Sequence, residues 1–315
     1  MALSTIDTSS ISGLGYGFKN RIINGAFGIW QRGTSFTPSS VVFGADRFAS
    51  YKSGASAGDY AQSSDTPSGQ GFTYSAYLNN ADLRQSIELP GAGLPGDYVV
   101  GSTWTLSFWV KGASAGSSNA GIGWANGVSA SSLNYWGSTQ NFNFTTSWTK
   151  ITQTFTVSGT PTGSQPAILV YISALGVGGY ITGVQLEAGT VATSFDWRPY
   201  GTELSLCQRY YQKIVSDASY TALGSGEADT TTAAAFFLKY NTTMRASPSF
   251  TYGGSLSAYT ANAFNAITAI GVGYFGKDSG LWQPTVGGAT LVAGRGLLLI
   301  ANGSTTAYFD LSAEL

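Results

Sequence analysis

Residues 104–111 read WTLSFWVK, and this stretch decides the fold class. Large apolar side chains recur at every second position, which is the period of a β-strand with one buried face. The expected inner face carries Trp104, Leu106, Phe108 and Val110, and the expected outer face carries Thr105, Ser107, Trp109 and Lys111. The stretch therefore predicts a half-buried strand that covers a core on one side only.

Similar strand signals follow further along the chain. Residues 151–157 alternate Thr with apolar side chains, and residues 167–174 are almost all apolar, as in a strand covered on both faces. Residues 180–187 form another candidate, in which Gly183 predicts a β-bulge. Gly- and Ser-rich turns separate these runs. We therefore predict an all-β domain over residues 20–200, an antiparallel β-sandwich of the jelly-roll type.

The start of this domain reads NRIINGAFGIWQRG, residues 20–33. Asn24-Gly25 is a turn signal between strand-forming side chains, so we predict a first strand that bends there. Phe27 and Trp30 are expected to point inward as core anchors. Residues 1–19, which are rich in Ser and Gly, are predicted to be an N-terminal attachment segment that becomes ordered against a partner, and the alternative is a flexible terminus.

One helical signal follows the sandwich. Residues 201–213 place Leu204, Cys207 and Tyr211 on one face, and Thr202 can cap the start. We predict a linking helix there, with Cys207 as a small buried hydrophobe.

Strand signals return over residues 214–315, which predicts a smaller C-terminal β domain and a possible oligomerisation knob. Residues 297–300 and 307–311, on either side of the turn Asn302-Gly303, are expected to pair as a closing hairpin. Packing against copies of itself is one way in which such a domain can cover exposed strand edges.

Composition excludes several functions. The net charge is −1 and basic residues are not clustered, so we expect neither a nucleic-acid partner nor membrane insertion. The chain has no histidine, which removes Ser-His-Asp and Cys-His nucleophilic sites and His-ligated zinc. Paired carboxylates, as in glycoside hydrolysis, are the remaining catalytic option. A single cysteine excludes an internal disulfide.

Several motifs stand in a recognisable order along the chain. They are KNRIINGAFGIWQRGTSF (19–36), ADRF (45–48), LRQSIE (83–88), WTLSFWVKG (104–112), WTKITQTFTV (148–157), GVQLEAGTVATSFDWRPYGTELSLCQRYYQK (183–213), TMRASPSF (243–250) and YFDLSAEL (308–315). In these motifs and in their order, the chain resembles a family of phage tail-fibre-like virion proteins. The middle portion is similar to a carbohydrate-binding-module jelly roll.

The resemblance implies a virion protein, located in an external fibre of the phage particle, and a symmetric oligomer, for which a homotrimer is our first choice. It also implies that the N-terminal segment contacts other virion proteins. Related modules often hold a structural calcium through acidic residues before the final strand. This chain has Tyr180–Gly183 there, which argues against calcium, although Asp46 and Glu187 could still contribute oxygen ligands.

Sugars present apolar C–H faces and hydroxyl groups, so a glycan site needs aromatic faces beside amides and hydroxyls. Residues 123–143 match this requirement best, and the candidate glycan-binding residues are Trp124, Asn126, Asn134, Tyr135 and Trp136. Trp109, on the polar face of its strand, is a second candidate, and the favoured alternative for this ring is that another layer or another subunit covers it. The alternative is that the rings of 123–143 belong to core strands and the amides to turns.

These observations predict a non-enzymatic phage fibre protein, a tail fibre or receptor-binding fibre that adheres to a host surface glycan. The first alternative is a structural capsid decoration or tail-assembly protein that binds no sugar. A polysaccharide depolymerase is a minor alternative, because the sequence does not show which acids lie close together. We expect no catalytic residues, no metal site and no cofactor.

Overall fold

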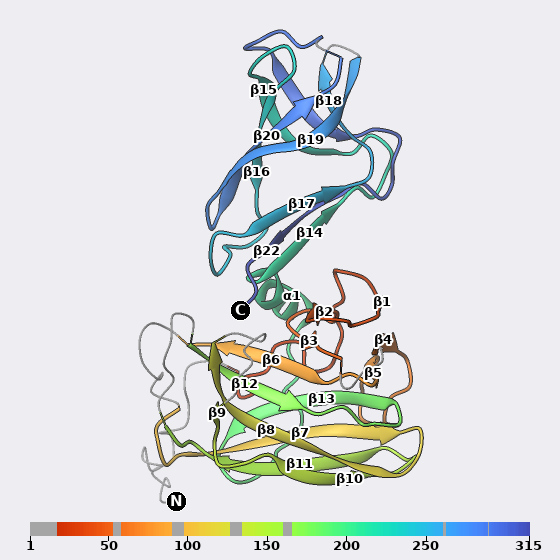
Figure 1. Cartoon of the computed structure of the whole chain (residues 1–315), viewed down its shortest axis with the longest axis vertical. Coiled ribbons are helices and arrows are strands. Elements are labelled where there is room, and N and C mark those ends of the chain that lie inside the picture. Colours follow the sequence, from red (N-terminus) through yellow and green to blue (C-terminus); the bar gives the residue numbers. More distant parts are fainter. Residues whose placement is uncertain are drawn as a thin grey trace, which may run out of the picture. The chain divides into compact units, whose positions relative to one another are not determined.

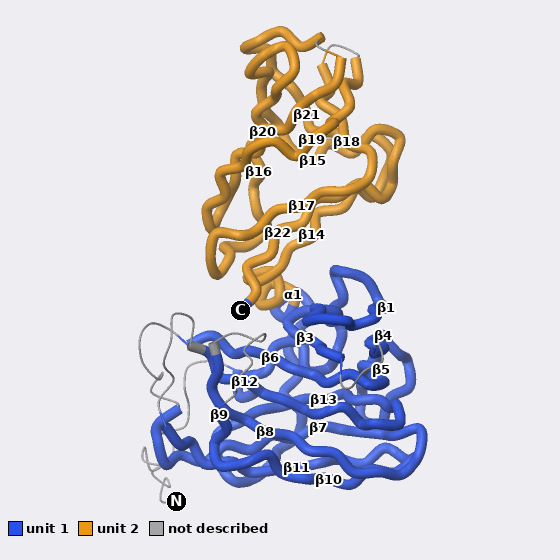
Figure 2. The backbone as a smooth tube through the Cα atoms, viewed as in Figure 1, with its two compact units in different colours: residues 1–203, 315 blue, residues 204–314 orange. Residues whose placement is uncertain are grey.

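The computed structural model describes residues 18–52, 58–89, 98–126, 134–159, 166–260, 263–288 and 290–315. The chain divides into two compact units, residues 1–203 with 315 and residues 204–314 (Figure 2). The division falls within the helix α1 (Tyr200–Gln208). In the described part of the chain, no helix is long and apolar enough to cross a membrane.

The first unit is an antiparallel β-sandwich, as predicted (Figure 1). One sheet has the order β1 (Ser35–Phe36), β4 (Asp59–Ser63), β5 (Ser75–Asn79), β13 (Gly179–Ala188), β7 (Thr103–Gly112) and β11 (Thr149–Thr156). The other has the order β10 (Gln140–Phe144), β8 (Gly116–Asn126), β12 (Pro166–Ile172), β6 (Leu83–Glu88), β3 (Ala49–Ser50) and β2 (Val42–Phe43), and β9 (Asn134–Tyr135) pairs with β8. An apolar core lies between them.

The alternation in β7 is confirmed. Its inner side chains, Trp104, Leu106, Phe108 and Val110, are all 0% exposed. On its flanks β7 pairs with β11 and β13. On its outer face Thr105 and Ser107 are buried as well, whereas Trp109 and Lys111 are half-buried, so the expected exposed face holds only for the second half of the strand. The predicted bulge is also confirmed, since the register between β13 and β7 shifts between Thr182 and Gln185.

The prediction of a first strand over residues 20–33 is wrong. Residues 20–33 form no strand, and both Asn24 and Phe27 have positive φ angles, 61° and 55°. Within this loop, the Asn24 side chain donates to the carbonyls of Ile29 and Asp46 and accepts from the Ile29 amide. These bonds replace a strand ladder, because a buried backbone needs hydrogen-bond partners of some kind. The predicted burial of Phe27 is confirmed, and its ring stacks on Phe48 at 4.6 Å.

The helix is shorter than expected. It ends at Gln208, and the residues expected to complete it begin strand β14 (Tyr211–Val215). The reason is long-range pairing, since β14 pairs with β22 (Tyr308–Ser312). Burial of Cys207 is confirmed.

The second unit contains a three-stranded sheet and a closed barrel. In the sheet, β22 lies between β14 and β17 (Ser249–Gly253). The barrel runs β15 (Ala222–Ala228), β16 (Ala234–Lys239), β20 (Ser279–Val286), β19 (Ala263–Phe275), β18 (Leu256–Thr260) and β21 (Gly296–Ala301). The expected closing hairpin is wrong, because β21 belongs to the barrel and β22 to the sheet. Pairing of β22 with two distant strands replaces the local hairpin.

Candidate functional site

A cleft of about 320 Å³ opens on the outer face of β7. Its floor comes from β7, β11 and β13, and its walls come from two irregular segments, residues 69–72 and 193–197. The lining residues are Gly69, Gln70, Phe72, Ser107, Trp109, Lys150, Gly183, Gln185, Thr193, Ser194, Phe195 and Trp197. Aromatic rings and polar groups therefore share one concave surface. Trp109, the second candidate from the sequence, lies in this cleft.

Gly183 allows the rings in the cleft to approach the sheet. Its φ is +64°, in the left-handed region that side chains disfavour. A Cβ at this position would lie 2.6 Å from Cζ of Phe72 and 3.1 Å from Cδ1 of Trp109. The bulge in β13 is thus also the place where Phe72 and Trp109 close over the backbone.

Rings from the two walls form a cluster. Phe72, Phe195 and Trp197 have centroid separations of 4.8 to 5.1 Å. Phe72 is 8% exposed, whereas Trp197 is 52% exposed. The buried ring of Phe72 therefore packs against the more exposed ring of Trp197.

Hydrogen bonds fix the 193–196 segment on β13. The side-chain NH2 of Gln185 donates to the Glu187 carboxylate at 2.8 Å. The side-chain carbonyl of Gln185 accepts from the backbone N–H of Asp196 at 2.8 Å. Glu187 also accepts from the Thr193 amide and hydroxyl, at 2.9 and 2.7 Å. These bonds hold the 193–196 segment against β13.

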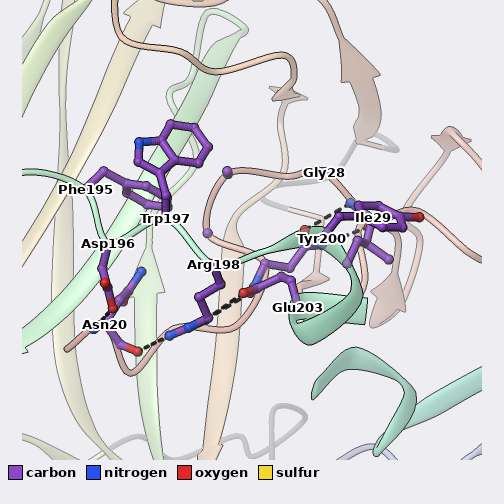
Figure 3. Close-up of a pocket in the computed structure, with 12 residues that line it drawn as sticks. Asn20, Gly28, Ile29, Phe195, Asp196, Trp197, Arg198, Tyr200 and Glu203 are labelled. Atoms are coloured by element: carbon purple, nitrogen blue, oxygen red, sulfur yellow. Dashed lines mark hydrogen bonds and ion pairs between the residues drawn. The ribbon is translucent and has the colours of Figure 1, made fainter. Parts of the chain in front are cut away.

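A second cavity, of about 200 Å³, lies beside the first between residues 20–29 and 195–203. Phe195 and Trp197 line both. Figure 3 shows Arg198 extended between Asn20 and Glu203 in this region. Arg198 donates to the Glu203 carboxylate at 2.9 and 3.0 Å and to the Ile22 carbonyl at 3.0 Å. This guanidinium ties the loop that starts the sandwich to the segment that ends it.

The residues selected from the sequence lie elsewhere, around β8 and β9. Trp136 is 2% exposed and belongs to the core, where it lies 5.9 Å from the ring of Tyr98. Trp124 is half-buried and packs against the same core, opposite Asn134 in the strand register. Two of the candidate glycan-binding residues, Trp124 and Trp136, thus have their rings against the interior. The pairing of β8 and β9 within the sheet directs these rings toward the core.

The remaining members of that set are more open. Asn134 is exposed and Tyr135 is half-buried, and burial raises the pKa of the Tyr135 hydroxyl above its ordinary value. The Asn126 side chain falls outside the described residues, as do residues 1–17 of the proposed attachment segment.

Phe72, Phe195 and Trp197 were missed by the sequence analysis. Each stands outside an alternating run, so none was expected to serve a strand. This position outside the strand patterns could have marked them as candidate site residues. Large aromatic side chains in an irregular segment have no place in a sheet that requires them to be buried.

The two carboxylates named for calcium already have partners. Asp46 is buried and accepts from the Gln31 amide at 3.0 Å and from the Gln31 side chain. Glu187 holds the 193–196 segment. Within the described ranges, groups of three or more His, Cys, Asp or Glu side chains arranged to hold a metal ion are absent.

Comparison with known proteins adds a family match. Residues 97–171 match the model of the carbohydrate binding domain family. This range includes Ser107, Trp109 and Lys150 of the cleft. No curated protein matches the sequence.

Several solved structures are similar to part of the chain. The enzymatically active domain of tailspike protein 4 from bacteriophage CBA120 is 17% identical over 54% of this chain, with a TM-score of 0.33, and the chain covers 22% of that domain's length. A putative sugar binding protein from Bacteroides thetaiotaomicron is 13% identical over 54% of this chain and all of its own, with a TM-score of 0.34. A family 22 carbohydrate binding module of Clostridium thermocellum is 13% identical over 56% of this chain and 99% of its own, with a TM-score of 0.34.

Proposed function

We propose that this chain is a non-enzymatic fibre protein of a phage virion, a tail fibre or receptor-binding fibre, and that its sandwich adheres to a host surface glycan in the cleft over β7 and β13. The match of residues 97–171 to the carbohydrate binding domain family carries the glycan part of the proposal. The order of motifs that resembles tail-fibre-like proteins supports the virion part.

The chemistry of the cleft suits a sugar. Pyranose rings have an apolar C–H face that stacks on an aromatic ring and hydroxyl groups that bond to polar side chains. Trp109 and Trp197 supply rings, and Gln70, Ser107 and Lys150 supply polar groups around them. The volume of about 320 Å³ lies within the range of small-molecule sites, about 300–1,000 Å³. A short stretch of a polysaccharide fits these limits.

Adhesion rather than cleavage is supported by the available acid–base groups. The chain has no histidine. Near the cleft, Glu187 accepts hydrogen bonds from Thr193 and Gln185, and Asp196 accepts one from the Asn20 amide. Carboxylates engaged in this way stabilise the wall of the cleft, and a hydrolase needs carboxyl groups that face the glycosidic bond.

A weak single contact becomes useful in an oligomer. Linked copies gain roughly 10²–10⁴ in avidity when several sites engage one surface. A homotrimeric fibre attached through its N-terminal segment to other virion proteins satisfies this requirement.

The experiment is binding to a panel of immobilised polysaccharides, including bacterial capsule and O-antigen preparations, xylan and mixed-linkage glucan. We expect the wild-type chain to bind at least one of them, and Trp109→Ala and Trp197→Ala to weaken that binding at least tenfold. Tyr51→Ala is the matched control, since Tyr51 is an exposed aromatic residue outside the cleft.

Three results would redirect the proposal. Retention on the panel by both tryptophan variants would place the site elsewhere. No binding at all, together with no inhibition of phage adsorption by free protein, would favour a capsid decoration or tail-assembly protein. Release of reducing sugar ends from the bound polysaccharide would make the chain a depolymerase.

A further inference from the structure

The outer face of the C-terminal barrel carries a row of large apolar side chains. In the strand register Phe237 of β16 lies opposite Leu281 of β20, and Leu281 lies opposite Tyr274 of β19. Directly opposed side chains in an antiparallel sheet are about 4.5–5.5 Å apart at Cβ, so Leu281 lies beside both Phe237 and Tyr274 on the same face of three neighbouring strands. Val272 stands two residues before Tyr274 on the same strand. We call these four residues the barrel patch.

The barrel patch is exposed although it is apolar. Its members are 38% to 64% exposed, with Tyr274 at the upper limit. Their neighbours in sequence point inward, since Phe236, Leu238 and Trp282 are 0% exposed. Strands β16 and β20 are thus apolar on both faces around the patch, which is the pattern of strands covered on both sides. A sheet with one face in water normally carries polar residues there.

Polar groups surround the barrel patch. Lys239 follows Phe237 on the outer face of β16, and it is exposed. Gln283, opposite Val272, donates to the Asp229 carboxylate at 2.8 Å. An apolar centre with a polar rim is the anatomy of a protein interface.

We propose that the barrel patch is the surface through which copies of this chain associate with one another. The barrel is closed, so its strands offer no free edge and contact must occur through side chains of the face. The patch contains no charged residue, and interfaces between identical subunits are more apolar and poorer in charge than transient ones. With a net charge of −1, copies repel one another little.

In a symmetric oligomer, other copies of the chain are enough to cover the barrel patch. In a homotrimer, a patch at the threefold axis meets the same patch of the other two copies, so one surface supplies every side of the contact. The proposed function includes an oligomer, and this inference names the surface that joins its copies. It rests on the proposed function only through that oligomer. Glycan binding does not enter it.

The test is sedimentation velocity of the full chain over a range of concentrations. We expect the wild type to sediment as an oligomer and Phe237→Lys/Leu281→Lys to sediment as a monomer. Tyr274→Lys is the second variant, because a side chain so exposed can be charged without loss of core packing. The matched control is Val215→Lys, a change of the same kind on exposed Val215 of β14, outside the barrel.

Circular dichroism and the melting temperature establish that each variant is folded. Loss of the oligomer in Tyr274→Lys and in the double variant, with the control unchanged, supports the inference. A monomeric wild type, or a folded Tyr274→Lys variant that stays oligomeric, overturns it. The Trp197→Ala variant is expected to remain oligomeric, and the Tyr274→Lys variant to keep its single-site glycan affinity, so failure of one proposal is distinguishable from failure of the other.

Discussion

Two groups of aromatic residues in the same sandwich have opposite surroundings. Around β8 and β9, Trp124 and Trp136 pack against the core although amides flank them in the sequence. Over β7 and β13, Trp109 and Trp197 line a cleft although they lie far apart in the sequence. Proximity of rings and amides along a chain therefore does not show which rings share an open surface. The sheet face toward which each ring points decides it.

The largest expected effect is a loss of folding stability, which should differ between the two groups of rings. Trp136→Ala removes a buried ring, and we expect the free energy of unfolding to fall by about 3–5 kcal/mol. Trp197→Ala, at a half-exposed position, serves as the comparison and should cost much less. Denaturant unfolding followed by fluorescence measures both. Equal costs would contradict the assignment of Trp136 to the core and Trp197 to the cleft.

A second test concerns the bulge that brings the cleft rings together. Gly183→Ala adds a Cβ in a positive-φ position and against Phe72, so we expect a loss of about 1–3 kcal/mol in stability and weaker glycan binding. Gly176→Ala is the matched control. Its φ is +75° with no heavy atom within 4 Å of the added Cβ, so it carries the backbone strain alone. If both variants bind glycan equally well, the contacts at Gly183 do not shape the cleft.

The third test concerns affinity. Trp197→Ala should reduce glycan affinity at least tenfold, which corresponds to about 1.4 kcal/mol, through loss of the stacking face. Trp197→Phe keeps a smaller ring and should recover part of the loss. Isothermal titration with an oligosaccharide prepared from the polysaccharide bound on the panel measures both. An unchanged affinity in Trp197→Ala would remove this ring from the site.

The smallest expected effect is on pH dependence, at the outer face of β7. Burial alone would raise the pKa of Asp65, but hydrogen bonds from Lys111 at 2.6 Å and Trp148 at 3.0 Å outweigh it and lower that pKa. A lowered pKa in the folded state means that the stabilisation is present above the ordinary value of 3.8 and is lost as pH falls through the folded value.

Asp65→Asn should therefore reduce stability at neutral pH by less than about 1 kcal/mol and flatten the decline in acid. Melting temperatures measured between pH 7 and strongly acidic buffer test this. Parallel curves for wild type and variant would show that Asp65 does not act through its charge.

Local patterns predicted what depends on near neighbours. The alternation of residues 104–111 identified the buried face of β7, and Gly183 marked the bulge in β13. Both follow from strand geometry within a few residues. The same reasoning named Trp109 on the outer face, so one ring of the cleft could be identified from sequence.

Features that depend on distant pairing could not be predicted in this way. The loop of residues 20–33 is held by the Asn24 side chain rather than by a strand ladder. Strand β22 pairs with β14 and β17 instead of its neighbour β21. Trp136 turns inward to pack beside Tyr98. Phe195 and Trp197 reach the cleft because Gln185 and Glu187 fix their segment on β13. The partners of β22 and of Trp136 lie far along the chain. The bonds of Asn24, Gln185 and Glu187 are closer in sequence, but they follow no strand or helix period that a sequence pattern reports.

The indole resonances of the chain provide the most direct measurement of where a glycan binds. The eight tryptophans each give one indole N–H signal, which Trp→Phe variants assign. On titration with the oligosaccharide identified above, we predict that the signals of Trp109 and Trp197 shift while those of Trp124 and Trp136 stay in place. Shifts at Trp124 and Trp136, with Trp109 and Trp197 unchanged, would contradict a glycan site over β7 and β13.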